Sequence, residues 1–410
     1  KFEIATTPPP PPSNPVTKWL VVGGPFGEEH ATKLISVYAA ACSFLSYFAV
    51  YGFRKPWTAV TWEDQPTLFG FTDPKLFLDW SQILGYVLGK FIGIFVVPTI
   101  RNEHRFYILL SLPLLSLTVW MLLGFFHDVG PWMVFLCFFY SGMPLSIAWS
   151  LLYRFLEGRN NPDFLGAVLS ASIIMGSSVA KTIGGSILDL GVGAYWVPFA
   201  TGCCYIGPFI LLAFLTRAIP EPSVEEREKM AERRPMTQEE KMNFFSRHWI
   251  GLIAFTAPYI LTTSARDFRD TFTVDIFKSF GENEDDFSTL IFLIDVPVGF
   301  IVCGFLICLT FIEDNARNIF SQHLVMGTGY VLVLFFQTAF TFEWISDKIW
   351  YAGCGVGIYM AYTPVASMFY DRLGGALPKN EEIGTATFMI QVSDFCGYVG
   401  TITLYSLQGF

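Results

Sequence analysis

YFAVYGFRKPWTAVTW (residues 47–62) and YILTTSARDFRDTFTVDIF (residues 259–277) share one pattern in two distant parts of the chain. Each stretch starts apolar, carries an arginine deep in the apolar run, and has an aromatic residue three positions later: Arg54 with Trp57, and Arg269 with Phe272. Arg54 also lies about as far into its run as Arg266 lies into the second. The pattern indicates an internal repeat.

The composition places this repeat in a lipid bilayer. Hydrophobic residues make up 52% of the 410 residues, and charged residues only 15%, against roughly 25% in an average soluble domain. A soluble enzyme would need more charge to cover its surface. The net charge of −9 argues against a nucleic-acid partner, which would require clustered lysine and arginine.

A membrane-spanning helix needs about 20 mostly apolar residues, and the chain contains eleven such runs. They are residues 33–61, 79–100, 105–127, 131–154, 163–190, 195–217, 249–278, 287–312, 318–342, 347–370 and 384–410. We therefore expect an all-α membrane protein of two six-helix bundles, with eleven helices present and a twelfth expected beyond Phe410. The expected parts are a proline-rich tail (1–32), a first bundle (33–217), a charged linker (218–247) and a second bundle (248–410).

Basic residues predict the orientation, because lysine and arginine concentrate in short cytoplasmic loops. The even-numbered loops carry Arg101 and Arg105, Arg154 and Arg159, the basic residues from Arg217 through Arg247 in the linker, Arg317, and Arg372 with Lys379. We expect a multi-pass protein whose N-terminus, linker and even loops face the cytoplasm, or the matrix or stroma of an organelle. The sequence does not distinguish a plasma membrane from an organellar one.

Arginines inside the apolar runs predict a binding site for an anion. A charge at the centre of a spanning helix costs about 2.5–3.5 kcal/mol, so it normally pairs or faces water. Arg54 and Arg266 or Arg269 would approach a shared cavity from opposite halves, and a guanidinium fits phosphate or carboxylate oxygens. The alternative is that Arg266 pairs with Asp270 and that Arg54 extends outward.

Four further charges suggest ion pairs between the halves. Lys90 and Asp295 occupy equivalent helices of the two halves, the second and the eighth. Lys181 and Asp394 likewise occupy the fifth and the eleventh. In a two-bundle transporter the second helix runs beside the eleventh, and the fifth beside the eighth. We therefore expect the pairs Lys90–Asp394 and Lys181–Asp295, which would couple the halves. Alternatively, Lys90 faces the cavity and assists the arginines, or one of the aspartates carries a proton.

These residues resemble the major facilitator superfamily, and especially its organophosphate:phosphate antiporters. Their first helix carries an Arg-Lys-x-aromatic segment, matched by residues 54–57, and their second a Gly-x-x-Lys-Phe-Ile segment, similar to residues 86–93. Arg266 best matches their second substrate arginine, with Arg269 as its rival. Residues 156–159, 164–166 and 394–398 also look like an uncharacterised branch of the superfamily.

The sequence departs from the family pattern in two places. The family's loop after helix two has a Gly-x-x-x-Asp-Arg-x-Gly-Arg pattern that locks the inner side. Here, residues 93–105 lack the aspartate and keep Arg101 and Arg105, while Asp314 and Arg317 remain in the loop after helix eight. We assign these four residues to gating. The antiporters' histidine in helix five has no counterpart, and Lys181 lies in that helix instead.

The resemblance and the buried charges together predict a secondary transporter of a small organic anion, such as a phosphorylated metabolite exchanged for phosphate by alternating access. A proton-coupled symporter is one alternative. A structural subunit of a larger membrane complex that has lost transport is another. No residue pattern indicates an enzyme, a metal, another cofactor or a phosphate loop of the GxxxxGK[ST] kind.

Overall fold

The computed structural model describes residues 28–156, 159, 161–220, 238–281, 287–376 and 386–409. Most of the proline-rich tail and of the linker, together with Lys379, lie outside the described residues. The division of the chain at residues 218–247 therefore stays a prediction.

The first half is a series of helices that cross the molecule in alternating directions. They are α2 (Glu28–Arg54), α3 (Pro74–Val96), α4 (Asn102–Phe126), α5 (Pro131–Leu145), α6 (Ala148–Leu156), α7 (Pro162–Asp189) and α8 (Val197–Arg217). Short 3₁₀ turns join some of them: η1 (Pro56–Ala59), η2 (Val97–Thr99), η3 (His127–Val129) and η4 (Ala194–Trp196).

The second half repeats this arrangement. Its helices are α10 (Gln238–Thr271), α11 (Thr273–Ser279), α12 (Phe287–Thr310), α13 (Asn315–Thr341), α14 (Asp347–Ser367), α15 (Phe369–Ala376) and α16 (Ala386–Gly409). Each of the eleven runs expected from the sequence overlaps one of these long helices, or a long helix continued by a short one, although some helices begin several residues before their run. The predicted all-α fold is confirmed.

Some of these helices are less apolar than ordinary membrane spans. Among the described residues, seven helices are long and apolar enough to cross a bilayer, and α3, α10, α14 and α16 are not among them. Each of these four carries buried polar side chains, such as Asp79, Arg266, Thr363 and Asp394. Their polar positions face the protein interior instead of lipid.

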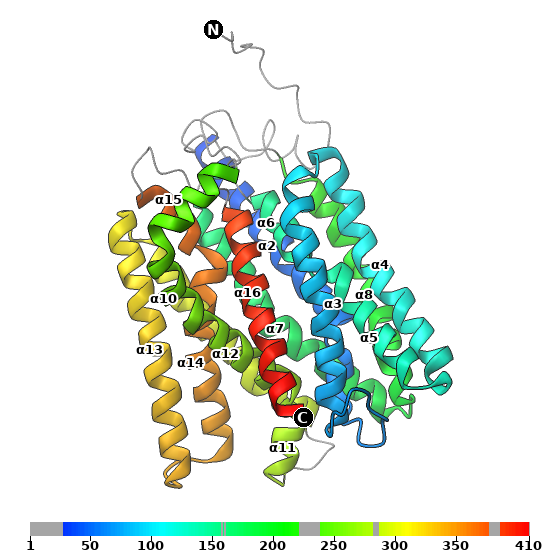
Figure 1. The fold of residues 1–410 in the computed structure, drawn as a ribbon. Helices are drawn as coiled ribbons and strands as arrows, with labels where there is room; N and C mark the ends of the chain where they lie inside the picture. Colours follow the sequence, from blue (N-terminus) through cyan, green and yellow to red (C-terminus); the bar gives the residue numbers. More distant parts are fainter. Residues whose placement is uncertain are drawn as a thin grey trace.

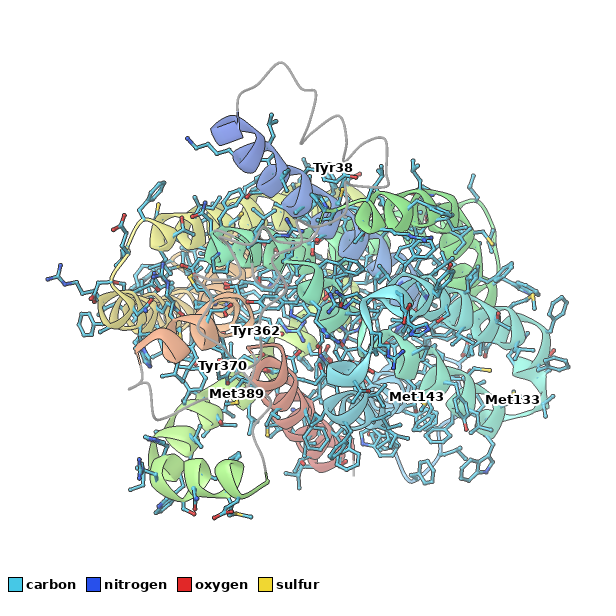
Figure 2. The ribbon with its side chains drawn as sticks, turned by 90° about the horizontal axis from the view of Figure 1, so that it is seen from above. Tyr38, Met133, Met143, Tyr362, Tyr370 and Met389 are labelled. Atoms are coloured by element: carbon cyan, nitrogen blue, oxygen red, sulfur yellow. The ribbon has the colours of Figure 1, made fainter. Side chains whose placement is uncertain are left out.

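The two halves meet along α3 with α16 and along α7 with α12, as the repeat predicts. Figure 1 shows the start of α2 and the residues on either side of the linker at one end of the molecule, here called the linker end, with α11 at the opposite end. Viewed along the helices, Tyr362 lies among the inner helices and Met133 at the periphery (Figure 2).

Two glycines bring α16 close to α10. A Cβ atom added at Gly397 would lie 2.8 Å from Thr263 Oγ1, and one added at Gly400 would lie 2.1 Å from Ile260 Cγ2. In lipid, helices associate mainly by such close packing, because the bilayer is as apolar as their side chains. This contact holds the polar face of α16 against α10 in the middle of the molecule.

Candidate anion-binding site

Polar side chains form a buried stripe on α3 and another on α16, which form one of the two helix pairs along which the halves meet. On α3 the stripe is Lys75, Asp79, Gln82, Tyr86 and Lys90, all at most 2% exposed. On α16 it is Gln391, Asp394, Tyr398, Thr401 and Tyr405, all at most 6% exposed. Spacings of three and four residues place each set on one helix face, so the interface of the halves is polar along its length.

The centre of the site is formed where α2 ends inside the protein. Pro56 cannot continue a helix, so α2 stops at Arg54 and Lys55. The free carbonyl of Arg54 accepts hydrogen bonds from Trp57 Nε1 and Gln82 Nε2, both at 3.1 Å. These bonds satisfy a buried helix end and fix the position of the Arg54 side chain.

Arg54 and Arg266 donate to the same hydroxyl group. Arg54 Nη2 lies 3.0 Å and Arg266 Nη2 lies 2.9 Å from Tyr398 Oη. The two side chains are 3% and 2% exposed, so neither is turned toward lipid. Two guanidinium groups from opposite halves therefore converge on one oxygen atom, and their binding of an anion stays a prediction.

Neither arginine has a carboxylate of its own at close range. The nearest acidic atom to Arg266 is Asp267 Oδ1, at 4.0 Å from Nη2. No ion pair of Arg54 occurs within the described part of the chain, and the Nε atoms of both arginines lack a hydrogen-bond partner there. The alternative pairing of Arg266 with Asp270 is not found, because Asp270 binds Lys181 instead.

Tyrosine rings line this pair of guanidinium groups. Tyr86 lies 4.2 Å from Arg54 Cζ, and Tyr362 lies 4.7 Å from Arg266 Cζ, measured to the ring centroids. Tyr86 and Tyr398 pack with centroids 4.6 Å apart. The ring faces stabilise the cations without neutralising them, which leaves their charge available to an anion.

The predicted Lys90–Asp394 pair is present. Lys90 Nζ lies 2.8 Å from Asp394 Oδ2, and Tyr259 Oη donates to Asp394 Oδ1 at 2.7 Å. Lys90 is fully buried and also contacts Gln391. It therefore belongs to the interface between halves, and its assignment as a substrate residue stays a prediction.

The predicted Lys181–Asp295 pair is wrong. Lys181 Nζ lies 2.9 Å from Asp270 Oδ1, and Arg269 Nη2 lies 2.6 Å from Asp295 Oδ1. Successive residues of a helix point about 100° apart, so Arg269 faces α12 and Asp270 faces α7. Helices α7 and α12 do run side by side, and Ser178 bonds Asp295 at 2.9 Å, but α10 supplies the ionic partners of both.

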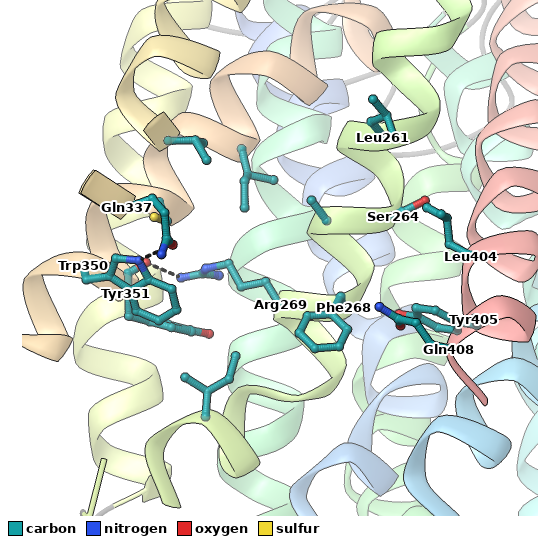
Figure 3. Close-up of a pocket in the computed structure, with 15 residues that line it drawn as sticks. Leu261, Ser264, Phe268, Arg269, Gln337, Trp350, Tyr351, Leu404, Tyr405 and Gln408 are labelled. Atoms are coloured by element: carbon teal, nitrogen blue, oxygen red, sulfur yellow. Dashed lines mark hydrogen bonds between the residues drawn. The ribbon is translucent and has the colours of Figure 1, made fainter. Parts of the chain in front are cut away.

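Arg269 consequently lies away from the central pair of arginines. Its Cζ is 3.9 Å from the Tyr351 ring centroid, and it borders a pocket of about 410 Å³ lined largely by apolar side chains (Figure 3). A Cβ atom at Gly355 would lie 2.6 Å from Arg269 Nη2, so glycine is required for this approach. Of the two rival arginines, Arg266 is the one that shares a site with Arg54.

A cluster of charges that was not predicted from the sequence lies beside this site. Lys55 Nζ lies 3.3 Å from Asp267 Oδ1, 3.6 Å from Asp79 Oδ1 and 3.9 Å from Asp270 Oδ2. The Lys55 ammonium group is thus within 4 Å of three carboxylates. The buried stripe on α3 was the signal that could have revealed Asp79, because its polar residues recur every three or four positions.

Residues other than the predicted ones join the halves at the linker end. Arg372 Nε donates to Asp163 Oδ2 at 2.7 Å, and Tyr153 donates to Asp371. The four assigned gating residues make contacts within their own half: Arg101 with Glu103, Arg105 with the Arg154 carbonyl, and Asp314 with the Arg317 amide. Their gating role stays a prediction.

The opposite end is also closed by ion pairs between halves. Lys75 Nζ lies 2.6 Å from Asp275 Oδ2, and Lys278 Nζ lies 2.6 Å from Glu63 Oε1. The hydrogen bond and charge of Lys278 lower the pKa of the exposed Glu63 carboxyl group. The central arginines are therefore enclosed by ionic contacts toward both ends.

In the described residues, no group of three or more histidine, cysteine, aspartate or glutamate side chains could hold a metal ion. The eight cysteines are unpaired thiols. The site described so far is thus made of guanidinium, ammonium, carboxylate and phenol groups.

The fold is found in solved membrane transporters. A D-xylose-proton symporter matches with a TM-score of 0.55 and 13% identity over 90% of this chain and 88% of that chain. The major facilitator superfamily proton:xylose symporter XylE, bound to 6-bromo-6-deoxy-D-glucose, matches with a TM-score of 0.59 and 12% identity over 92% and 89%. The chain is therefore a multi-pass membrane protein with a major facilitator fold.

No curated protein matches the chain by sequence. The model of a protein family matches residues 56–410, which include all the residues of the candidate site except Arg54 and Lys55. The chain belongs to this family, described as the family of unknown function DUF5690.

Proposed function

We propose that this protein is a secondary active transporter of a small organic anion, such as a phosphorylated metabolite, and works by alternating access. The observation that carries the proposal is the convergence of Arg54 and Arg266, from opposite halves, on the Tyr398 hydroxyl. Retaining two buried cations without their own carboxylates costs folding free energy. A bound anion would recover that cost.

The geometry suggests how binding would be linked to movement. Tyr398 Oη occupies the place between the guanidinium groups that an oxygen of a phosphate or carboxylate would take. A guanidinium presents parallel N–H donors to such oxygens. Because Arg54 belongs to one half and Arg266 to the other, an anion bound by both would hold the halves together, and loss of either contact would favour its release.

Exchange against inorganic phosphate is the leading form of this proposal. A phosphate monoester and inorganic phosphate present the same oxygens to the arginines, so either can complete the site. Exchange would follow if the halves moved readily only when one of them was bound. The resemblance of residues 54–57 and 86–93 to the organophosphate antiporters supports this form.

Proton-coupled symport is a second candidate. The two solved structures named above are proton symporters by their titles. In addition, Asp79, a buried carboxyl group with no hydrogen-bond partner among the described residues, lies beside the anion site. A symporter would respond to a pH gradient, whereas an exchanger would require an anion on the other side.

The test is uptake of radiolabelled glucose 6-phosphate into liposomes that contain the purified protein. Vesicles loaded with phosphate, empty vesicles and vesicles with an imposed pH gradient separate exchange from symport. Arg54→Gln and Arg266→Gln should abolish uptake, while Arg217→Gln, whose guanidinium stacks on Phe106 and Tyr107 outside the site, should retain it.

Uptake that survives loss of either site arginine would contradict the anion-site proposal. Absence of uptake for a panel of phosphate esters, together with co-purification in a stoichiometric membrane complex, would instead favour a structural subunit.

A further inference from the structure

Asp79 differs from the other buried carboxyl groups of the site. Its side chain is fully buried, yet neither carboxylate oxygen receives a hydrogen bond within the described residues. Its nearest cation, Lys55 Nζ, lies 3.6 Å away and is closer to Asp267, at 3.3 Å. Lys55 also donates to Thr271 Oγ1 at 2.8 Å, so its two shortest contacts are with α10.

The aspartates proposed from the sequence as proton carriers are, in contrast, fully engaged. Asp394 accepts from Lys90 and Tyr259, and Asp295 accepts from Arg269 and Ser178. Hydrogen bonds and an adjacent cation favour the charged form of a carboxyl group. Among the described residues, Asp79 is the carboxyl group of the site with neither oxygen hydrogen-bonded, which makes it the one best suited to bind a proton.

The surroundings of Asp79 do not provide a second cation to balance its charge. The groups that face it are Lys55, Asp267 and Thr271, Tyr405 on α16, and Lys75 one turn earlier on α3. Lys75 is held by Asp275. The other neighbour of α3, α5, has no charged residue. An ionised Asp79 would thus share a single ammonium group with Asp267, and a buried unpaired charge is strongly unfavourable.

The charges of the interface, counted over the described residues, make this proton relevant to the anion. Between the ion pairs at the two ends, six buried cations face five buried carboxyl groups. They are Arg54, Lys55, Lys90, Lys181, Arg266 and Arg269, and Asp79, Asp267, Asp270, Asp295 and Asp394. With Asp79 ionised the excess is one positive charge. With Asp79 protonated it is two, which matches a phosphate monoester above its second pKa of about 6.

We propose that Asp79 is a proton-binding site of this protein, and that its protonation is linked to occupancy of the site formed by Arg54 and Arg266. The negative charge of a bound anion would favour the neutral form of Asp79, and a neutral Asp79 would leave more positive charge for the anion. By linkage the two effects are equal. This inference rests on the proposed anion site. It adds a proton on Asp79 that accompanies the substrate, and it applies whether or not phosphate is carried in exchange.

The first experiment needs no substrate. Infrared spectroscopy of the purified protein should show a protonated carboxylic acid band that persists well above about pH 4, where an exposed aspartate titrates. Asp79→Asn should remove this band, and Asp79→Glu should shift it. Asp295→Asn, which changes an equally buried but fully bonded carboxyl group, should leave it in place. A wild-type protein without such a band, or with a band unaffected by Asp79→Asn, would overturn the assignment.

The second experiment measures the linkage. Glucose 6-phosphate added at about pH 7.5, above its second pKa of about 6, should cause proton uptake from a weakly buffered solution containing the wild-type protein. Asp79→Asn should bind the ester without proton uptake. Binding by the wild type without uptake would overturn the linkage but not the anion site. Failure of the wild type to bind any phosphate ester would overturn the anion site and the linkage, while the infrared band would still decide whether Asp79 binds a proton.

Discussion

Lys90 Nζ and Asp394 Oδ2 lie 2.8 Å apart across the interface of the two halves, although 304 residues separate them in the chain. Both are buried, so their pairing avoids the cost of an isolated charge in a medium of low dielectric. The pair sits next to Tyr398 on the stripe of α16 and fixes the rotation of that helix. It thereby helps to aim the Tyr398 hydroxyl at the two arginines.

The pair can be tested by exchanging its charges. Lys90→Met or Asp394→Leu alone leaves one buried charge unpaired and should destabilise the protein by about 3–5 kcal/mol. The double variant Lys90→Asp with Asp394→Lys should be more stable than either single variant, as measured by thermal unfolding in detergent. If the double variant is less stable than each of the two single variants, the two residues are not coupled.

Tyr398 should hold the site in the absence of substrate. Tyr398→Phe removes the shared hydroxyl group and leaves two buried guanidinium donors unsatisfied, at a cost of about 1–3 kcal/mol. The melting temperature should therefore fall, and added inorganic phosphate should raise it by more than in the wild type. Tyr330→Phe, which removes a hydroxyl group that contacts Thr262 Oγ1 at 3.0 Å, is the matched control and should not alter the phosphate effect.

Arginine geometry should matter more than charge at the central site. Arg54→Lys and Arg266→Lys keep a positive charge but lose the guanidinium fork, so stabilisation by glucose 6-phosphate should be lost in both. Equal stabilisation of the lysine variants and the wild type would show that a simple positive field is sufficient.

Arg269 should be structural. Arg269→Gln breaks the ion pair with Asp295 and should destabilise the protein by about 3–5 kcal/mol. The affinity for glucose 6-phosphate in the remaining folded fraction should stay close to that of the wild type. A selective loss of affinity, with stability retained, would reassign Arg269 to the anion site.

The Glu63–Lys278 contact predicts a pH dependence at the end of the molecule away from the linker. Lys278 lowers the pKa of Glu63, so the contact is present at neutral pH and is lost as pH falls through that lowered pKa. Both side chains are substantially exposed, so high salt should weaken it as well. Lys278→Met should return the Glu63 pKa to its usual value of about 4.3, measurable by NMR titration of the carboxyl group.

Spin labels can report whether this contact controls opening. The labels would be attached to Asp64→Cys and Ser279→Cys, both at exposed positions. The exposed cysteines Cys203, Cys204 and Cys308 would be replaced by serine. The distance between the two labels should increase at acid pH. If the Lys278→Met variant shows the same increased distance already at neutral pH, the result would support control of opening by the Glu63–Lys278 contact. Identical distances under all conditions would contradict it.

Much of the fold could be predicted because membrane helices are read directly from long apolar runs. The repeat placed the four further charges in equivalent helices, and the helix order of two-bundle transporters then predicted the Lys90–Asp394 pair. Lys181 was harder to place, because a charge pointing out of α7 can reach either α10 or α12. Only the rotation of α10, which separates Arg269 from Asp270, settled which neighbour it meets.

The sequence by itself determined the eleven helices, the two related halves and the set of charges that must be buried, since each follows from hydropathy along the chain. The tertiary structure alone decided the partners of those charges. It placed Tyr398 between Arg54 and Arg266, and it gave Asp79 no hydrogen-bond partner among the residues that the structure describes. The physical reason is that burial depends on position along a helix, whereas pairing depends on the angle at which each side chain leaves its helix and on which neighbouring helix lies there.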